Sequence, residues 1–326
     1  MTTVFAWIAT HSGSPRYIRG GPACYSTQAR APFIEVTREE HSMQNPSPTT
    51  RMPRPKRGGY FGPESLTWKM GAEAALTLGG TRAVLMQIAH PLVAEGVYRH
   101  SSYMSDPLAR TEHTFTLGQF LAFGSTARAQ KAARTINHLH THVQGTLSTS
   151  AGAYDRGTVY QARDPELLLW VHATLVDSIL LVYPLLFGPL SPEEQDRYYQ
   201  ESKTIARLLG LAASDMPASA EDLRSYVNDM VHSNRLAATP QARQLAHTVL
   251  FPPIPSIFRP LLHLNLQFTC AILPPPVRAI YGLEWSTPQQ RAFDVAIQGM
   301  RGVLPRLPMA LRMFPITRRL MQEALG

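Results

Sequence analysis

The feature that most constrains this fold is a series of apolar segments that each follow a helix-capping residue and stop at glycine or proline. One segment begins after Asp106-Pro107 and ends at Gly124, and another begins after Asp164-Pro165. An Asp, Ser or Thr in this place bonds the free N–H groups of a first helical turn, and proline fits the first helical position. The pattern recurs along the chain, so the sequence predicts many helices joined by short connections.

The expected helices follow one another from residue 64 onward, and only residues 150–162 have the character of a loop or short strand. Strand patterns are otherwise scarce, and no internal repeat is visible. The sequence therefore predicts an all-α fold, a multi-helix single domain over residues 58–326 with seven to ten helices. The expected helical ranges include 64–89, 91–101, 106–123, 125–145, 165–188, 191–210, 219–236 and 240–250.

Residues 1–57 differ in composition from the rest of the chain. They are rich in Pro, Gly, Ser and Arg without hydrophobic periodicity, so we expect a disordered leader or a start codon assigned too far upstream. They hold eight Lys or Arg and three acidic residues, which is most of the chain's net charge of +8. The remainder has no basic stripe, so we expect no nucleic-acid partner.

The two cysteines, Cys24 and Cys270, lie far apart in the sequence. This spacing argues against a secreted disulfide framework and favours a reducing compartment. We therefore expect a cytoplasmic protein, with a membrane-associated or organellar location as the alternative. Cys270 lies in the apolar stretch QFTCAIL, where a free buried thiol is the usual outcome.

The segment 165–188 is long and apolar enough to raise the question of a membrane span. It contains His172, Asp177 and Pro184, and ionisable groups are costly in the middle of a bilayer. A helix that is apolar on all sides is also typical of the centre of a large core. We therefore expect segment 165–188 to be a buried helix at the centre of the core.

Three histidines, His138, His140 and His142, fall within five residues of one expected helix. Apolar positions at helical spacing, among them Ile136 and Leu139, place His140 on the buried side of the helix. His138 and His142 then lie on the solvent-exposed side. On a strand all three would share one face, but the Ala-rich stretch before them favours a helix. His140 is then either a core imidazole bonded to a carbonyl or a single ligand of a metal or haem.

Arg110 and Thr114 are four residues apart and share a helix face whose apolar stripe continues through Leu117. An arginine on an apolar stripe is costly unless it meets an anion, such as a haem propionate. The alternative is a side chain that extends to solvent at the edge of the stripe.

Three further residues are candidates for the site. His172 has only apolar neighbours, and we favour a buried histidine bonded to another helix over a functional role. His90, at a helix break, lines a pocket or caps a helix. Glu95 is either a buried general base with a raised pKa or a solvated surface acid.

Motifs for other chemistries are missing from the sequence. It has no HExxH, no GxSxG, no Walker A and no dinucleotide-binding glycine loop after a strand. A di-iron bundle needs two Glu-x-x-His motifs, which the chain does not offer. The residues alone thus indicate a helical protein with a possible one-histidine metal or haem site.

Six segments together resemble the MpaB/rubber-oxygenase family, which includes bacterial latex-clearing proteins and a fungal oxygenase that cleaves a farnesyl chain. The resemblance covers about residues 58–290, and the segments agree in order and spacing. They are GYFGPESLTWKM, QIAHPLVAEGVYRHS, DPLARTEHT, INHLHTHVQGTL, DPELLLWVHATLVDS and GPLSPEEQDRYYQE.

The resemblance implies a globin-like helical core around haem b. The family's proximal histidine falls on His140, its Arg-x-x-x-Thr pair on Arg110 and Thr114, and a glutamate proposed as base near Glu95. His172 and Asp177 match a family motif without an assigned role. The chain lacks the secretion signal of the latex-clearing branch and a convincing anchor like that of the fungal branch.

We therefore expect a haem-b-dependent oxygenase that uses O2 on an apolar, unsaturated substrate, isoprenoid- or lipid-like, held in a cleft between the helices of 64–104 and 165–188. The alternatives are a non-catalytic haem carrier or sensor and a helical interaction protein without cofactor. Candidate catalytic residues are Arg110, Thr114 and Glu95; candidate cofactor-binding residues are His140, Arg110, His172 and His90, with His140 as the iron ligand.

Overall fold

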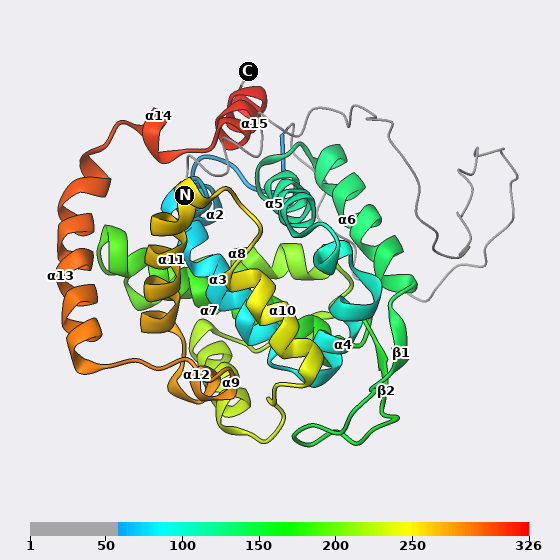
Figure 1. Ribbon diagram of the computed structural model, residues 1–326. Coiled ribbons are helices and arrows are strands. Elements are labelled where there is room, and N and C mark those ends of the chain that lie inside the picture. Colours follow the sequence, from blue (N-terminus) through cyan, green and yellow to red (C-terminus); the bar gives the residue numbers. More distant parts are fainter. Residues whose placement is uncertain (1–57, 326) are drawn as a thin grey trace, which may run out of the picture.

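The structure, a computed structural model, describes residues 58–325 and is mainly helical. The described part contains fourteen α-helices, α2 to α15, and one two-stranded sheet (Figure 1). The all-α prediction is confirmed. The prediction of seven to ten helices is wrong: one expected helix is divided, and α11 to α15 follow after residue 250, beyond the last helical range expected from the sequence. The predicted leader, 1–57, and Cys24 lie outside the described residues.

The elements of the first half, in chain order, are α2 (Leu66–Gly71), η1 (Ala74–Thr77), α3 (Leu78–Ile88), α4 (Pro91–His100), η2 (Ser102–Met104), α5 (Pro107–Phe123), α6 (Thr126–Thr141), β1 (Gln144–Thr146), β2 (Val159–Gln161) and α7 (Pro165–Phe187). Those of the second half are α8 (Pro192–Leu208), η3 (Ala213–Asp215), α9 (Ala220–His232), α10 (Pro240–Leu250), η4 (Ser256–Phe258), α11 (Arg259–Ile272), α12 (Pro275–Ile280), α13 (Thr287–Val303), η5 (Leu304–Arg306), α14 (Met309–Arg312) and α15 (Pro315–Leu325).

Local capping sets the starts of the long helices. Asp106 accepts a hydrogen bond from the backbone N–H of Ala109 and so caps α5. Asp164 caps α7 in the same way. Ser191 and Glu194 form a reciprocal capping box at the start of α8. These helices begin where the sequence predicts.

The expected single helix 64–89 is instead divided into α2, η1 and α3. The chain is extended at Glu73, which is 5% exposed and forms an ion pair with Arg312 of α14. A helical Glu73 would carry its carboxylate elsewhere, so a partner from the far end of the sequence fixes the break.

The end of α6 also differs from the prediction. The helix ends at Thr141, and Gly145 is a strand residue of β1 that pairs with Tyr160 of β2. A Cβ at Gly145 would lie 2.8 Å from the Tyr160 hydroxyl. Gly145 is therefore needed for close strand packing and does not cap the helix.

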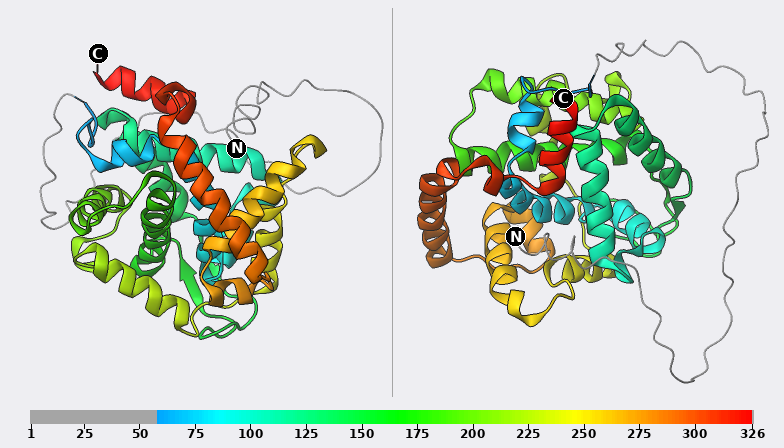
Figure 2. Two further views of the ribbon diagram at one scale, coloured as in Figure 1. Left: turned by 90° about the vertical axis from the view of Figure 1, so that its left-hand side faces the viewer. Right: turned by 90° about the horizontal axis from the view of Figure 1, so that it is seen from above.

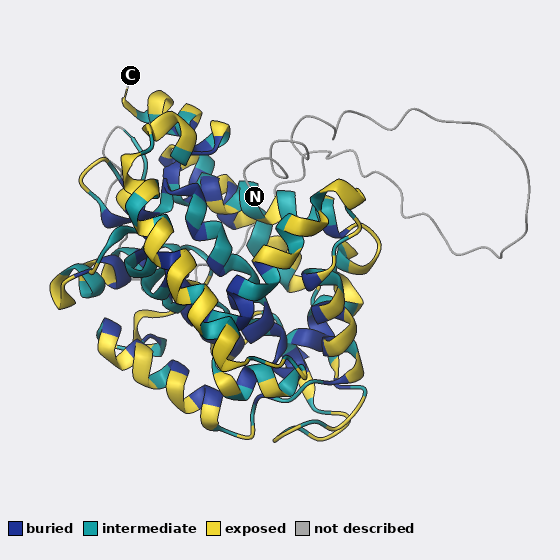
Figure 3. Cartoon of the chain, turned by 60° about the vertical axis from the view of Figure 1, so that its left-hand side comes forward, coloured by how far each residue is buried: buried dark blue, intermediate teal, exposed yellow. Residues whose placement is uncertain are grey.

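The core is organised around α7, which packs against α3, α8, α9 and α13. The Trp170 indole donates to the carbonyl of Met86 at 3.2 Å. A Cβ at Gly79 would lie 3.1 Å from the Val182 side chain, so α3 and α7 approach closely. The two helices are in direct contact, so a substrate cleft lined by the helices of 64–104 and 165–188 stays a prediction. Figure 3 shows buried residues on the inward sides of the helices.

Within the described residues, α7 is the one helix whose length and apolar composition would allow it to span a membrane. Its most apolar window is 44% buried inside the protein. A soluble core helix can meet the same criteria, and the packing of α7 on four other helices agrees with the core interpretation.

An ion pair lies inside this core. Arg82 of α3 is 4% exposed and donates to the Asp177 carboxylate of α7 at 2.6 Å. It also donates to the Ser178 hydroxyl at 2.7 Å and to the carbonyl of Ile272 in α11 at 2.9 Å. Asp177, which sequence reasoning leaves without a role, therefore helps to join three helices.

The C-terminal segment returns to the N-terminal half. Helix α15 lies beside α5, as the view from above shows (Figure 2). The Thr317 hydroxyl donates to the Gln119 side chain at 2.5 Å across this contact. An ion pair at 2.6 Å between Arg128 of α6 and Glu323 joins α15 to α6 as well.

Candidate functional site

Neighbouring elements at one end of the bundle carry most of the predicted site residues. Helix α5 packs against α6 and η2, and α4 packs against η2 and β2. These elements lie together on the right-hand side of Figure 1. They bring together Glu95 from α4, Arg110 and Thr114 from α5, and His140 from α6.

His140 is half-buried in the last turn of α6. Its Nδ1 atom is buried and has no hydrogen-bond partner in the described part of the chain. Burial lowers the pKa of the imidazole, and the positive charges of Arg110 and Arg163 lower it further. The ring is therefore neutral at pH 7, which is the form that binds metals. The core interpretation, an imidazole bonded to a carbonyl, is not what the structure shows.

Arg110 is half-buried and held by hydroxyl groups. Its Nε donates to the Ser101 Oγ at 3.0 Å, and its Nη1 donates to the Thr114 Oγ1. Among the described residues it forms no ion pair with a carboxylate, and burial lowers the pKa of the guanidinium. A partly desolvated cation without a counter-ion is suited to binding an anion.

Glu95 is fully buried, so the interpretation as a solvated surface acid is wrong. Its carboxylate accepts hydrogen bonds from Arg99 Nε, one turn later in α4, and from the Ser148 hydroxyl at 3.0 Å. Ser148 in turn accepts from Gln241 of α10 at 3.1 Å. Glu95 therefore ties α4 to the residues after β1.

His90 is fully buried, and its side chain does not cap α4. The Tyr154 hydroxyl lies 2.9 Å from His90 Nε2 and accepts from Arg235 Nε at 3.0 Å. The hydroxyl proton is then directed at Nε2, which assigns the ring proton of His90 to the unpartnered, buried Nδ1. Burial, with a smaller effect of the Arg235 charge, lowers the pKa of His90 to about 3.

His172 is buried between α7 and α8. Its Nε2 lies 3.3 Å from the Ser202 hydroxyl, which donates to the carbonyl of Tyr199 at 2.6 Å. Burial lowers the pKa of His172 to about 4, with a smaller contribution from the Lys203 charge. The structure shows the buried histidine bonded to another helix that we favour from the sequence, and it gives His172 no contact with His140.

His138 and His142 are exposed, as predicted, and their ring centres lie 5.0 Å apart. Leu139, predicted to be buried, is 49% exposed. The helix ends two residues later, so no further turn continues the apolar stripe over it. Periodicity thus separates the three histidines correctly but assigns Leu139 to the wrong environment.

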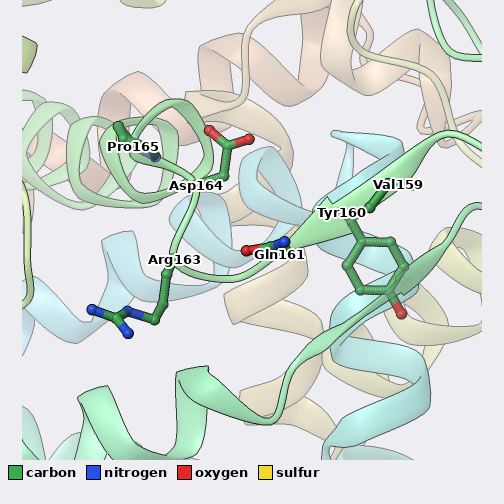
Figure 4. Close-up of a pocket in the computed structure, with 6 residues that line it drawn as sticks. All are labelled: Val159, Tyr160, Gln161, Arg163, Asp164 and Pro165. Carbon is green, nitrogen blue, oxygen red and sulfur yellow. The ribbon is translucent and has the colours of Figure 1, made fainter.

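An open pocket of about 370 Å³ is lined by β2 and the residues that follow it. In Figure 4 the side chains of Tyr160 and Arg163 lie at opposite ends of the group that lines it. Burial raises the pKa of Tyr160, and the Glu95 charge adds to the effect. His100 Nε2 lies 3.2 Å from the Tyr160 hydroxyl.

Sequence reasoning misses several neighbours of the site. Arg99 could be found, since it lies four residues after Glu95 on one helix face. Tyr160, Arg163 and Ser148 come from the strand hairpin, and no local pattern connects them to α4 or α6. Within residues 58–325, no group of three or more His, Cys, Asp or Glu side chains is placed to hold a metal ion.

Comparison with known proteins gives a family match over the part of the chain that contains the candidate site. Two uncharacterized mycobacterial proteins, Mb2261 of Mycobacterium bovis and Rv2237 of Mycobacterium tuberculosis, are each 27% identical over 225 residues, which is 67% of this chain and 84% of the relative. No solved structure matches the chain. The model of the catalytic domain of the ER-bound oxygenase mpaB/B' and rubber oxygenase matches residues 68–302, which include Glu95, Arg110, Thr114 and His140. The chain therefore belongs to the MpaB/rubber-oxygenase family.

Proposed function

We propose that this protein is a haem-b-dependent oxygenase that uses O2 on an apolar, unsaturated substrate of isoprenoid- or lipid-like character. Its family is one of oxygenases, which supports the reaction class. The observation that carries the haem proposal is the neutral, unpartnered imidazole of His140 next to the uncompensated charge of Arg110.

The residues present fit a haem group in two respects. Haem iron needs an axial ligand, and His140 offers a neutral imidazole whose buried Nδ1 has no hydrogen-bond partner among the described residues. Haem b also carries two propionates, and within residues 58–325 Arg110 forms no ion pair with a carboxylate. The charge of Arg163 acts on the same region. One histidine for the iron and nearby arginines for the propionates thus suit a haem group.

In this proposal His140 holds the iron, and bound haem supplies the activation of O2. Arg110 pairs with a propionate, and the hydroxyl groups of Ser101 and Thr114 hold its guanidinium in place. Arg110 and His140 are half-buried, which reduces competition from water for their contacts, whereas Thr114 is exposed. A globin-like arrangement of the helices around the haem is part of the same proposal.

Glu95 has a positioning role in this proposal. Both of its carboxylate oxygens are engaged, one by Arg99 and the other by Ser148. These two donors hold the carboxylate between α4 and the residues after β1. We therefore propose that Glu95 fixes the contact between α4 and the hairpin beside the site, and that His90 and His172 support the fold in the same sense.

The test is oxygen uptake by the haem-loaded protein with a panel of terpenoid alkenes. We expect substrate-dependent O2 consumption and incorporation of label from 18O2 into the product, with the number of labelled atoms defining the type of oxygenation. A protein that binds haem stoichiometrically yet consumes no O2 with any member of the panel would support the carrier or sensor alternative and contradict the oxygenase proposal.

A further inference from the structure

We propose that His138 and His142, at the C-terminal end of α6, form a two-histidine site for a late first-row divalent cation such as Zn2+. Both side chains are exposed, and their ring centres lie 5.0 Å apart with an angle of 83° between the ring planes. His142 is the C-cap of the helix, four residues after His138. The two imidazoles therefore lie close together at the end of the helix, with one ring edge-on to the other.

The distance between the rings is the one that a shared cation requires. An imidazole nitrogen lies about 2.1 Å from a bound zinc ion, so two ligand rings at a tetrahedral angle have centres roughly 5 Å apart. The end of the helix already holds the two rings at this separation, and rotation about their side-chain torsions would turn one nitrogen of each toward a shared ion. Water would complete the coordination.

The surrounding charges select the kind of cation. The segment 134–147 contains no Asp or Glu, so the site offers nitrogen ligands without carboxylate oxygens. Imidazole suits Zn2+, Cu2+ and Ni2+, whereas Mg2+ and Ca2+ prefer oxygen. The partial negative charge of the helix C-terminus favours a cation in this place, and the exposed Arg134, one turn before His138, opposes it in part.

This site is independent of the haem proposal. His138 and His142 lie on the exposed side of α6, whereas the Nδ1 atom of His140 is buried. Binding at the exposed pair would join the C-cap to the preceding turn, whose carbonyls at Leu139 and His140 already accept from the backbone N–H of His142. An ion there would therefore stabilise the turn that carries His140.

The experiment is a calorimetric titration of the purified full-length chain, free of any histidine tag, with Zn2+. We expect one site that is weakened about tenfold or more by His138→Gln and equally by His142→Gln, because each leaves a single ligand and removes the chelate effect. The matched control is His263→Gln, an exposed histidine of α11 with no acidic or histidine residue within four positions. This control should leave the affinity unchanged.

A second variant keeps the number of histidines and changes only their spacing. In His142→Gln/Gln144→His the second imidazole moves to β1, beyond the turn that it must share with His138. We expect this variant to bind Zn2+ as weakly as the single variants, with an unchanged circular dichroism spectrum. The proposal is overturned if the relocated pair, or either single variant, binds Zn2+ as tightly as the wild type.

Discussion

The Arg82 guanidinium and the Asp177 carboxylate form an ion pair at 2.6 Å inside the helical core, with 5% and 19% of their side chains exposed. Arg82 also donates hydrogen bonds to the Ser178 hydroxyl and to the carbonyl of Ile272. Asp177 thus compensates a charge that water barely reaches. The ion pair gives Asp177, in the segment DPELLLWVHATLVDS, a role in the stability of the fold.

The first prediction concerns this pair. Asp177→Ala should lower the free energy of unfolding by about 2–4 kcal/mol, because it leaves the buried Arg82 without its counter-ion. Urea denaturation at pH 7 measures the change, and Asp155→Ala, at an exposed position, is the control. An Asp177→Ala protein of wild-type stability that no longer binds haem would instead assign Asp177 to the site.

The second prediction concerns stability in mild acid. The pKa values of His90 and His172 are lowered to about 3 and about 4, whereas an unfolded histidine has a pKa of about 6.5. The unfolded chain therefore binds more protons, so stability is complete above pH 6.5 and is lost as the pH falls toward the folded pKa values. From pH 7 to pH 5 each histidine should remove about 2 kcal/mol from the free energy of unfolding.

Urea denaturation at pH 7 and pH 5 tests this loss. His172→Gln should remove about half of the histidine contribution, whereas the exposed His113→Gln should change it little. An equal pH dependence in the wild type and in His172→Gln would show that His172 does not stay neutral in the folded protein.

The third prediction concerns Glu95. Glu95→Ala leaves a cavity and two donors, Arg99 and Ser148, without their acceptor, and the exposed position of Arg99 limits the cost. We expect a loss of about 1–3 kcal/mol in unfolding free energy, with a smaller loss for Glu95→Gln, which keeps one acceptor. If Glu95→Gln folds with near wild-type stability and oxygen uptake at all pH values, the positioning role holds. A loss of uptake in a stable, haem-loaded Glu95→Gln protein would make Glu95 a catalytic base.

The fourth prediction concerns the anion partner of Arg110. Arg110→Met should weaken haem binding by about ten- to a hundredfold, because a charge-assisted hydrogen bond to a propionate is lost. Arg110→Lys should restore part of the affinity, since it keeps the charge but not the planar group. Titration with haem, followed by absorption, gives both values. Equal affinity in Arg110→Met and wild type would remove Arg110 from the haem site.

The sequence predicts those parts of the fold that depend on neighbouring residues. Helices α5, α7 and α8 begin where Asp106, Asp164 and Ser191 cap them, because a cap acts within one turn. The break at Glu73 is not predictable in this way, since its partner Arg312 lies 239 residues away.

In the candidate site, too, the features set by neighbouring residues are predictable and those set by tertiary contacts are not. Helical periodicity separates His140 from His138 and His142, because all three share one local helix. The burial of Glu95 and the charge of Arg163 near His140 depend on how the strand hairpin folds over α4 and α6. That contact is set by tertiary packing, which no pattern in a single segment specifies.

The central claim is that His140 is the iron ligand, and the absorption spectrum tests it most directly. The measurement compares wild type, His140→Ala and the neighbouring controls His138→Ala and His142→Ala after expression with added haem. We predict a Soret band in the wild type and both controls and its loss in a folded His140→Ala protein. A colourless wild type, or a His140→Ala protein that retains the full Soret band, would contradict the account.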